Sequence, residues 1–194
     1  MSSKSNVMAG KPRPGGFIFR APLGTALPTD AATPLAEAFI ELGYASSDGW
    51  SRQINKSYQA IIAYGGDEVL KTRTEHSVGF SLTLIEALNA ETNKAKWGEA
   101  AVKVTPATST HGQQITVSYA GADTPPAVYV LDMEDSGRIR RSVFPNAVDT
   151  TESFEQTFSD SDAINLPFTF SAYKDEATGL YFFDYSDDGK VLKA

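Results

Sequence analysis

The clearest hydrophobic pattern of the chain lies in residues 78–84, where apolar and small or polar side chains alternate. The apolar positions are Val78, Phe80, Leu82 and Leu84. Successive side chains of a β-strand point to opposite faces, so this stretch predicts a half-buried strand. A polar stretch with helical spacing follows and ends at Lys96-Trp97-Gly98.

Shorter runs of strand-forming residues occur along the rest of the chain. They lie at residues 17–20, 115–119, 128–133, 164–170 and 180–185. Turn residues at 47–49, 65–67, 120–123, 135–137 and 188–189 separate them, the last as a hairpin turn between 180–185 and 191–192. Many short antiparallel strands are typical of a β-sandwich or barrel.

One further helix is predicted over residues 34–42. Thr33 is placed to cap it, Pro34 occupies the first helical position and Gly43 ends it. Its apolar face repeats at helical spacing and consists of Leu35, Ala38, Phe39 and Leu42. The predicted fold class is therefore mainly β with short helices, in which a β-sandwich or barrel is flanked by a helix.

Pro167 interrupts an otherwise regular strand pattern. Proline has no N–H to donate, so we expect this strand to be an edge strand or to contain a bulge. An exposed edge invites pairing with another chain.

The composition fits one domain with an arm. Residues 1–16 have no periodicity and are rich in glycine and proline, which predicts an extended, flexible N-terminal arm. Residues 17–194 then form a single domain, because 41% hydrophobic residues are enough for a sizeable core. The chain has no cysteine, so packing rather than disulfides must hold it together.

Charge is distributed unevenly around a net value of −7. Residues 1–20 carry four cationic side chains and no acid, whereas residues 149–194 carry ten acids and three lysines. The positive arm of one copy and a negative surface of the next could attract one another. A solvated tail on an acidic protein explains the same charges equally well.

Candidate chemistry is sparse. His76 and His111 are the only imidazoles and lie in no ligand-spaced motif, so we expect no metal site and no cofactor. The carboxylates of 132–135 and 160–162 would support a hydrolase only if they faced each other across a cleft. Adjacent acids in turns are more often solvated surface, and the sequence predicts no enzyme.

Seven aromatic residues raise the alternative of a carbohydrate-binding β-sandwich on a virion or secreted assembly. They are Trp50, Tyr58, Tyr64, Tyr181, Phe182, Phe183 and Tyr185. Aromatics on strands more often pack in a core or an interface. Outside the arm no basic stripe exists, so stable DNA binding is not expected. No apolar run is long enough to insert in a membrane.

Several short motifs, in this order, resemble the major tail (tail tube) proteins of long-tailed, actinobacterial bacteriophages. They include residues 10–12 and 16–25, Glu41-Leu42-Gly43-Tyr44 followed by Ser47-Asp48-Gly49, Ala63-Tyr64-Gly65-Gly66-Asp67, residues 80–89 and Phe144-Pro145-Asn146-Ala147. Each motif alone is weak, and their order is specific.

The resemblance implies a virion protein of the phage tail. Such subunits are β-sandwiches that form rings, usually hexameric, which stack into a tube that delivers DNA. Expected partners are further copies, the tape measure protein, and the tail tip and tail terminator proteins, with assembly in the host cytoplasm and only transient passage of DNA. We expect contacts between copies in the loop region 44–67 and at Lys11, Arg13, Phe17, Phe19, Arg20, Trp50, Tyr64, Pro145 and Asn146.

The first prediction concerns the arm. Deleting residues 1–16 should leave a folded domain and weaken the stacking of copies, because the arm contributes no predicted core residue. Thermal unfolding checks the first part, and loss of a cooperative transition would contradict it.

Overall fold

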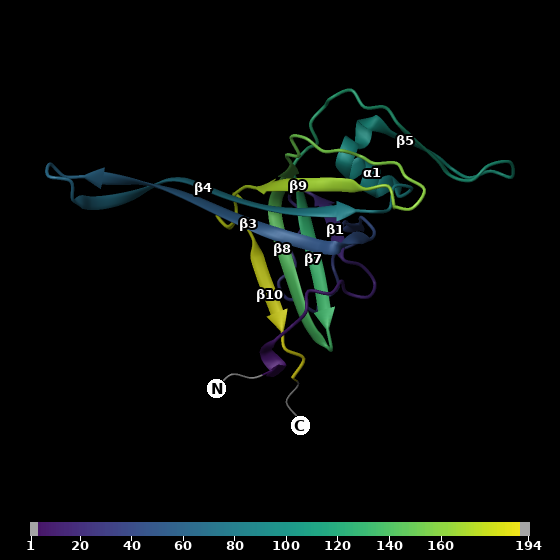
Figure 1. Ribbon diagram of the computed structural model, residues 1–194. Coiled ribbons are helices and arrows are strands. Elements are labelled where there is room, and N and C mark those ends of the chain that lie inside the picture. The colour runs from purple at the N-terminus through teal and green to yellow at the C-terminus, as the bar shows by residue number, and fades with distance from the viewer. Residues whose placement is uncertain (1–3, 191–194) are drawn as a thin grey trace.

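The structure, a computed structural model, describes residues 4–190 and is dominated by one antiparallel sheet (Figure 1). Its strands are β1 (Ile18–Pro22), β2 (Ile40–Glu41), β3 (Ala45–Ile62), β4 (Glu68–Leu84), β7 (Ala127–Asp135), β8 (Arg138–Asp149), β9 (Leu166–Ala172) and β10 (Phe183–Asp187). Their order is β2-β1-β7-β8-β9-β4-β3, and β10 pairs with β8. The mainly β fold predicted from the sequence is confirmed.

A smaller unit covers one end of this sheet. It contains the α-helix α1 (Ala90–Trp97), the 3-10 turn η2 (Glu99–Ala101) and the strand pair β5 (Val102–Thr105) and β6 (Gln114–Val117). Asn89 caps α1 by accepting a hydrogen bond from the Glu91 N–H, and Gly98 ends it at φ 88°. The predicted polar helix ending at 96–98 is thus confirmed. A second 3-10 turn, η1, spans Lys4–Asn6.

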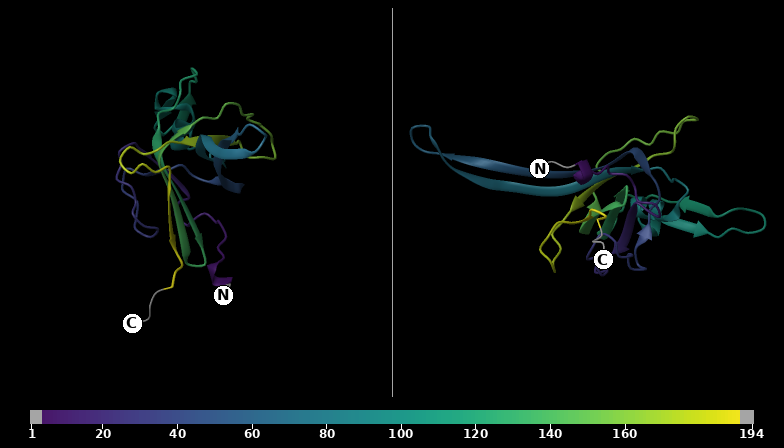
Figure 2. Two further views of the ribbon diagram at one scale, coloured as in Figure 1. Left: turned by 90° about the vertical axis from the view of Figure 1, so that its left-hand side faces the viewer. Right: turned by 90° about the horizontal axis from the view of Figure 1, so that it is seen from below.

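The main sheet bends so that its two halves cross and enclose the core (Figures 1 and 2). Phe80 of β4 stacks on Phe144 of β8 at 4.2 Å and on Phe170 of β9 at 4.5 Å between ring centroids. Tyr129 of β7 lies 4.5 Å from Phe170. The apolar face predicted for residues 78–84 is buried in this core.

The helix predicted over 34–42 is wrong. Asp30 instead accepts hydrogen bonds from the N–H groups of Ala32 and Thr33, and the buried guanidinium of Arg141 binds the carbonyls of Asp30 and Thr33. A distant arginine therefore holds the start of this segment in a non-helical form. The chain continues to β2, and Phe39 and Leu42 are still buried, but from an irregular backbone.

Two predictions about strand irregularities also need correction. Residues 47–49 are not a turn between strands but a register shift inside β3, where Gly49 has φ 70°. The strand that contains Pro167 is not an edge strand, since β9 lies between β8 and β4, and it pairs with β4 without a register shift. Pro167 lies outside the part of β9 that pairs with β8, so its missing N–H is tolerated there.

The other turns fall largely as predicted. Residues 65–67 connect β3 to β4, and Ser136 and Gly137 connect β7 to β8 with positive φ angles of 56° and 79°. The hairpin expected at 188–189 involves residues 191–192, which lie outside the described residues.

The N-terminal segment lies along β7 instead of standing free. Pro12 pairs with Met133, and the Arg13 N–H donates to the Asp132 carbonyl at 3.2 Å. Lys11 forms an ion pair with Asp135 at 3.1 Å. Deletion of residues 1–16 is therefore expected to lower the melting temperature, while the retention of a folded domain remains a prediction.

Lys96 fixes α1 to the main sheet. Its buried Nζ lies 3.0 Å from Asp149 and donates to the Pro167 carbonyl at 2.6 Å, between the rings of Phe154 and Phe168. Burial lowers the pKa of Lys96, and the Asp149 charge opposes this shift. Each charge compensates the other, whereas either charge buried alone at this site would be strongly destabilising.

Replacing Lys96 by Met should destabilise the protein by about 3–5 kcal/mol, because Asp149 is left charged and buried. The free energy of urea unfolding measures this loss. The double variant Lys96→Met with Asp149→Leu should recover most of it. A double variant as unstable as the single one would show that the ion pair is not the reason.

Candidate functional site

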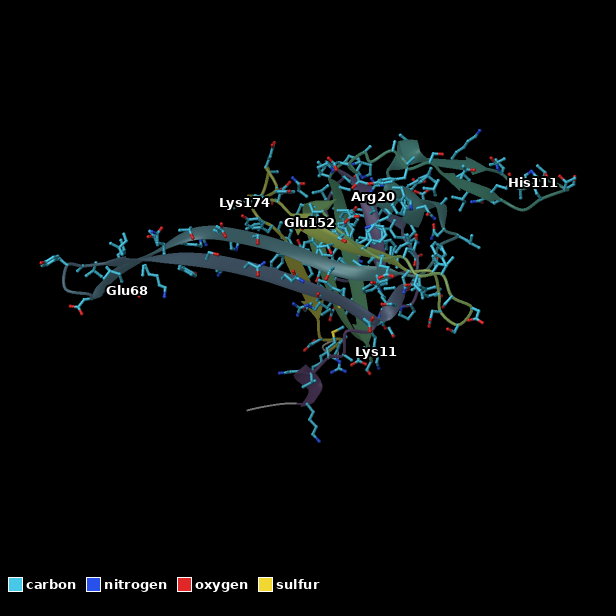
Figure 3. The ribbon with its side chains drawn as sticks, turned by 45° about the horizontal axis from the view of Figure 1, so that its top comes forward. Lys11, Arg20, Glu68, His111, Glu152 and Lys174 are labelled. Atoms are coloured by element: carbon cyan, nitrogen blue, oxygen red, sulfur yellow. The ribbon has the colours of Figure 1, made fainter. Side chains whose placement is uncertain are left out.

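Strands β3 and β4 form a long hairpin that projects from the body of the protein (Figure 1). The inner half of β4, from Val78 to Leu84, alternates between buried and half-buried residues, whereas residues 68–75 are all exposed. At about 3.3 Å per residue, residues 55–62 of β3 extend roughly 26 Å. Glu68, close to the end of the hairpin, lies far from the body in Figure 3.

The outer end of this hairpin is apolar although it is exposed. Ile61 pairs with Leu70 across the two strands, and both side chains are about half exposed. Ile62 and Val69 lie beside them, and Tyr64 in the turn is fully exposed. Exposed apolar groups gathered at one place mark sites of protein interaction.

The root of the hairpin is fixed by Arg52. Its guanidinium donates to both carboxylate oxygens of Asp184 in β10, at 2.7 and 2.6 Å, and to the Ser142 hydroxyl at 3.0 Å. It also covers the ring of Phe182 at 3.9 Å. A bidentate arginine–carboxylate pair sets geometry as well as energy, so β3 is held in one orientation.

Asp184 is kept ionised by this arrangement. Burial alone would raise its pKa, but hydrogen bonds from Arg52 and Ser142, with the charges of Arg52 and Arg140, hold the pKa below its ordinary value. Arg140 lies 3.0 Å from the same carboxylate.

Free sheet edges form the second part of the site. Among the described residues, β3 ends the sheet on one side and the two-residue β2 ends it on the other, while β10 pairs only with β8. Unpaired N–H and C=O groups along such edges can pair with strands of another chain.

The residues predicted for contacts between copies occupy three kinds of position. Tyr64 and Lys11 are exposed. Phe17 and Pro145 are buried inside the chain, and the partly buried Trp50 packs edge-on against Phe80 and Phe144.

The remaining four are partly buried. Arg13 forms ion pairs with Asp132 and Glu134, and Phe19 packs on a small apolar cluster. Arg20 lies 3.7 Å from Glu99. Asn146 sits in a register shift of β8, and its buried Oδ1 has no hydrogen-bond partner in the described structure.

The sequence indicates mostly strand from Tyr44 onward with a turn at 65–67, which the structure confirms, but the description of 44–67 as a loop region for contacts missed the length of the projecting hairpin. The outer half of β3 is exposed on both faces, so it shows no alternation. A signal was present: the apolar pairs 61–62 and 69–70 lie on either side of the predicted turn at 65–67. Two strand-forming runs joined by a short glycine-containing turn are typical of a hairpin.

The groups considered for the alternative functions lie in several parts of the described structure. Phe182 packs against Phe144, Phe183 stacks with Tyr185, and Tyr58 lies on the projecting hairpin. Asp132 is buried and bound by Arg141 at 2.7 Å. In residues 4–190, no group of three acidic or histidine side chains is arranged to hold a metal ion.

These features define a class of protein before any comparison. A rigid β body with free sheet edges and an apolar projecting hairpin is typical of a structural protein that associates with other chains. A family model described as phage tail tube protein matches residues 4–191.

The chain therefore belongs to the phage tail tube protein family, a structural component of the virion tail. The resemblance to tail tube proteins is confirmed, and membership in a structural family suggests that the chain is not an enzyme. A search of curated proteins finds no match. None of the helices described here has the length and apolarity needed to cross a membrane.

Asp184→Asn should weaken the hairpin root by about 1–3 kcal/mol at pH 7, because hydrogen bonds to a charged group are lost. The pKa of Asp184 is lower in the folded state than in the unfolded state. The stability that Asp184 contributes is therefore fully present above its unfolded pKa of about 3.9, and it is lost as the pH falls through the folded-state pKa. Urea unfolding at pH 7 and pH 3 measures the difference between wild type and variant.

Asp187→Asn in the same strand is the matched control, since within residues 4–190 Asp187 accepts only a local hydrogen bond, from the Gly189 N–H. A destabilisation by Asp184→Asn that is equal at both pH values would contradict the electrostatic explanation.

Proposed function

We propose that copies of this chain assemble into rings, hexameric by resemblance to the family, and that the rings stack into a tube through which DNA passes. The observation that carries this proposal is the projecting hairpin with its exposed apolar end. An isolated chain gains nothing from exposing Ile61, Leu70 and Tyr64 to water. Contact with another copy would bury them.

The free edges support the ring. Pairing of β3 or β10 with a strand of the next copy would satisfy backbone groups that are unpaired within one chain. A head-to-tail contact of this kind forms a closed ring when the rotation from one copy to the next divides a full turn evenly. A second contact, between rings along their common axis, would stack the rings into a filament.

The net charge of −7 supports passage of DNA. Phosphate groups are repelled by an acidic wall, and binding to DNA depends on cationic side chains that release counterions. In this proposal the tube assembles in the host cytoplasm around the tape measure protein. The tail tip protein lies at one end of the tube and the tail terminator protein at the other.

Negative-stain electron microscopy of the purified protein at high concentration, with and without phage tail tips, tests the proposal. Rings or hollow tubes are the expected result. Isolated particles of one chain under both conditions would contradict it.

Shortening the hairpin tests the observation on which the proposal depends. Replacing residues 58–74 by Asn-Gly joins the paired residues Ser57 and Glu75 through a two-residue turn. The removed residues contribute no side chain to the core, so the variant should keep its cooperative thermal unfolding. It should fail to form tubes, because the apolar hairpin end is gone.

The control is the same replacement of residues 106–113, the loop between β5 and β6, which projects on the opposite side of the body (Figure 2). This control should still form tubes. Tubes from the shortened hairpin at the wild-type yield would show that the hairpin is dispensable.

A further inference from the structure

Unpaired positive charge is scarce in this chain, and most of it gathers at one place. Most lysine and arginine side chains of residues 4–190 form ion pairs. Those that form no ion pair within this range are Lys4, Lys56, Arg73, Lys103 and Lys174. Lys56, Arg73 and Lys174 act together on one imidazole, that of His76.

The pairing of β3 with β4 places two of these cations on one face of the hairpin. Lys56 lies directly opposite His76, and Tyr58 lies opposite Arg73. Residues two apart along a strand point to the same face, so the two pairs lie side by side. Lys56, Tyr58 and Arg73 are all exposed.

The connection between β9 and β10 completes this surface. Lys174 Nζ lies 5.8 Å from the centre of the Tyr181 ring, and that ring lies edge-on to His76 at 5.0 Å. Desolvation lowers the pKa of His76, and positive charges lower it further. The charges are those of Arg73, Lys56 and Lys174. Cations and aromatic rings from three distant parts of the sequence thus form one cationic patch.

Carboxylates of the neighbouring sequence limit the size of the cationic patch. They are Asp67, Glu68, Glu75, Asp175 and Glu176. Glu75 lies opposite Ser57, on the other face of the hairpin, and accepts a hydrogen bond from the Ser57 hydroxyl at 3.2 Å. Asp175 accepts hydrogen bonds from the N–H and hydroxyl of Thr178 at 2.8 and 2.7 Å. The patch is therefore small and can hold only a few anionic groups.

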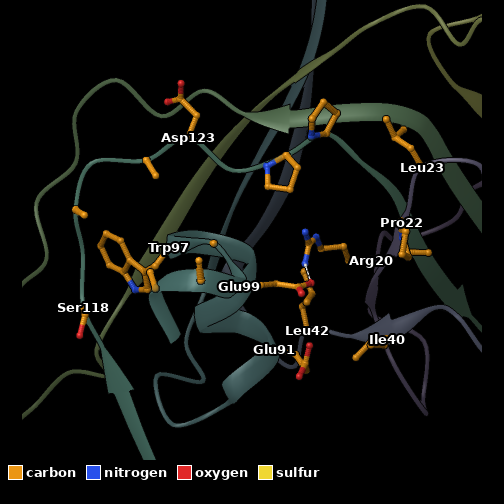
Figure 4. Close-up of a pocket in the computed structure, with 18 residues that line it drawn as sticks. Arg20, Pro22, Leu23, Ile40, Leu42, Glu91, Trp97, Glu99, Ser118 and Asp123 are labelled. Atoms are coloured by element: carbon orange, nitrogen blue, oxygen red, sulfur yellow. Dashed lines mark ion pairs between the residues drawn. The ribbon is translucent and has the colours of Figure 1, made fainter. Parts of the chain in front are cut away.

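The pocket beside Trp97 has a different electrostatic character. It measures about 580 Å³ and opens where the end of β1 meets α1 and η2 (Figure 4). The cation in its lining, Arg20, lies 3.7 Å from Glu99, and Glu91 and Asp123 also line it. An anion would be repelled there, so the cationic patch is the better place for an anionic ligand.

We propose that the cationic patch contacts the phosphate backbone of duplex DNA. This proposal rests on the proposed function, which brings DNA to every copy in the tube. Lysine, arginine and tyrosine side chains all contact phosphates, and such contacts carry no base preference. The sequence shows no basic stripe because strand pairing, not proximity along the chain, brings these cations together.

A patch of three cations on an acidic chain predicts a weak contact that depends strongly on salt. Each phosphate that a cation neutralises contributes about −0.9 to the slope of log affinity against log salt concentration, so the patch predicts a slope of about −2.7. The net charge of −7 opposes tighter binding. Contact of this strength would guide DNA along the tube without retaining it.

Fluorescence anisotropy of a short labelled DNA duplex, titrated with the purified chain at several salt concentrations, tests the proposal. The test variant is Lys56→Gln with Arg73→Gln. Both side chains are exposed, so the melting temperature should stay unchanged. The variant should reduce the salt slope by about 2 and weaken binding at about 50 mM salt by roughly tenfold or more, because two of three phosphate contacts are lost.

Lys4→Gln with Lys103→Gln is the matched control, since it removes the same charge from two other cations without an ion pair in residues 4–190. This control should keep the wild-type slope. Equal weakening by both variants would overturn the proposal, as would a wild-type chain that binds no DNA at about 20 mM salt. Polyglutamate that binds as tightly as DNA of the same charge would assign the patch to an acidic polypeptide instead.

The two histidines of the chain locate the contact directly. In NMR spectra of the untagged protein, added duplex should shift the ring signals of His76 and leave those of His111 unchanged. Equal shifts of both rings, or of neither while the duplex binds, would overturn the proposed site.

The outcomes separate this inference from the proposed function. Wild-type tubes together with a chain that binds no DNA would overturn the cationic patch as a DNA site and leave the tube intact. A chain that binds DNA at His76 but forms neither rings nor tubes would contradict the proposed function alone.

Discussion

The projecting hairpin depends on the contacts that Arg52 makes at its root. Its guanidinium joins β3 to Asp184 of β10 and Ser142 of β8, and covers the ring of Phe182. The inner half of the hairpin is therefore part of the packed core, and the outer half extends from it as a continuation of the same two strands. A two-stranded ribbon is only marginally stable alone, so its orientation comes from this anchor together with the pairing of β4 with β9.

The same chain thus combines a well-packed interior with surfaces that are incomplete. The interior contains the stacked rings of Phe80, Phe144 and Phe170. Two of its buried charges, Lys96 and Asp149, form an ion pair. The apolar hairpin end, the free strand edges and the pocket beside Trp97 remain open to other molecules. Assembly of many copies into a tube, as proposed above, would give these surfaces a common explanation.

The sequence predicted the parts of the fold whose signals are local. Alternation marked the inner part of β4 (Val78–Leu84), and a polar stretch with helical spacing that ends at Lys96-Trp97-Gly98 marked α1. The helix at 34–42 failed because Arg141, more than one hundred residues away, binds the Asp30 and Thr33 carbonyls. The length of β3 was missed because a strand exposed on both faces has no alternation, and the pocket was missed because distant segments form its walls.

Hydrogen exchange of the free and assembled protein measures most directly whether the hairpin end is the surface that joins copies. Amides are protected where their hydrogen bonds are stabilised or removed from solvent. Backbone amides of residues 58–73 should exchange rapidly in the free chain and become protected in the tube, while those of residues 106–113 should change little. Equal exchange of residues 58–73 in both states would contradict the central role of the hairpin.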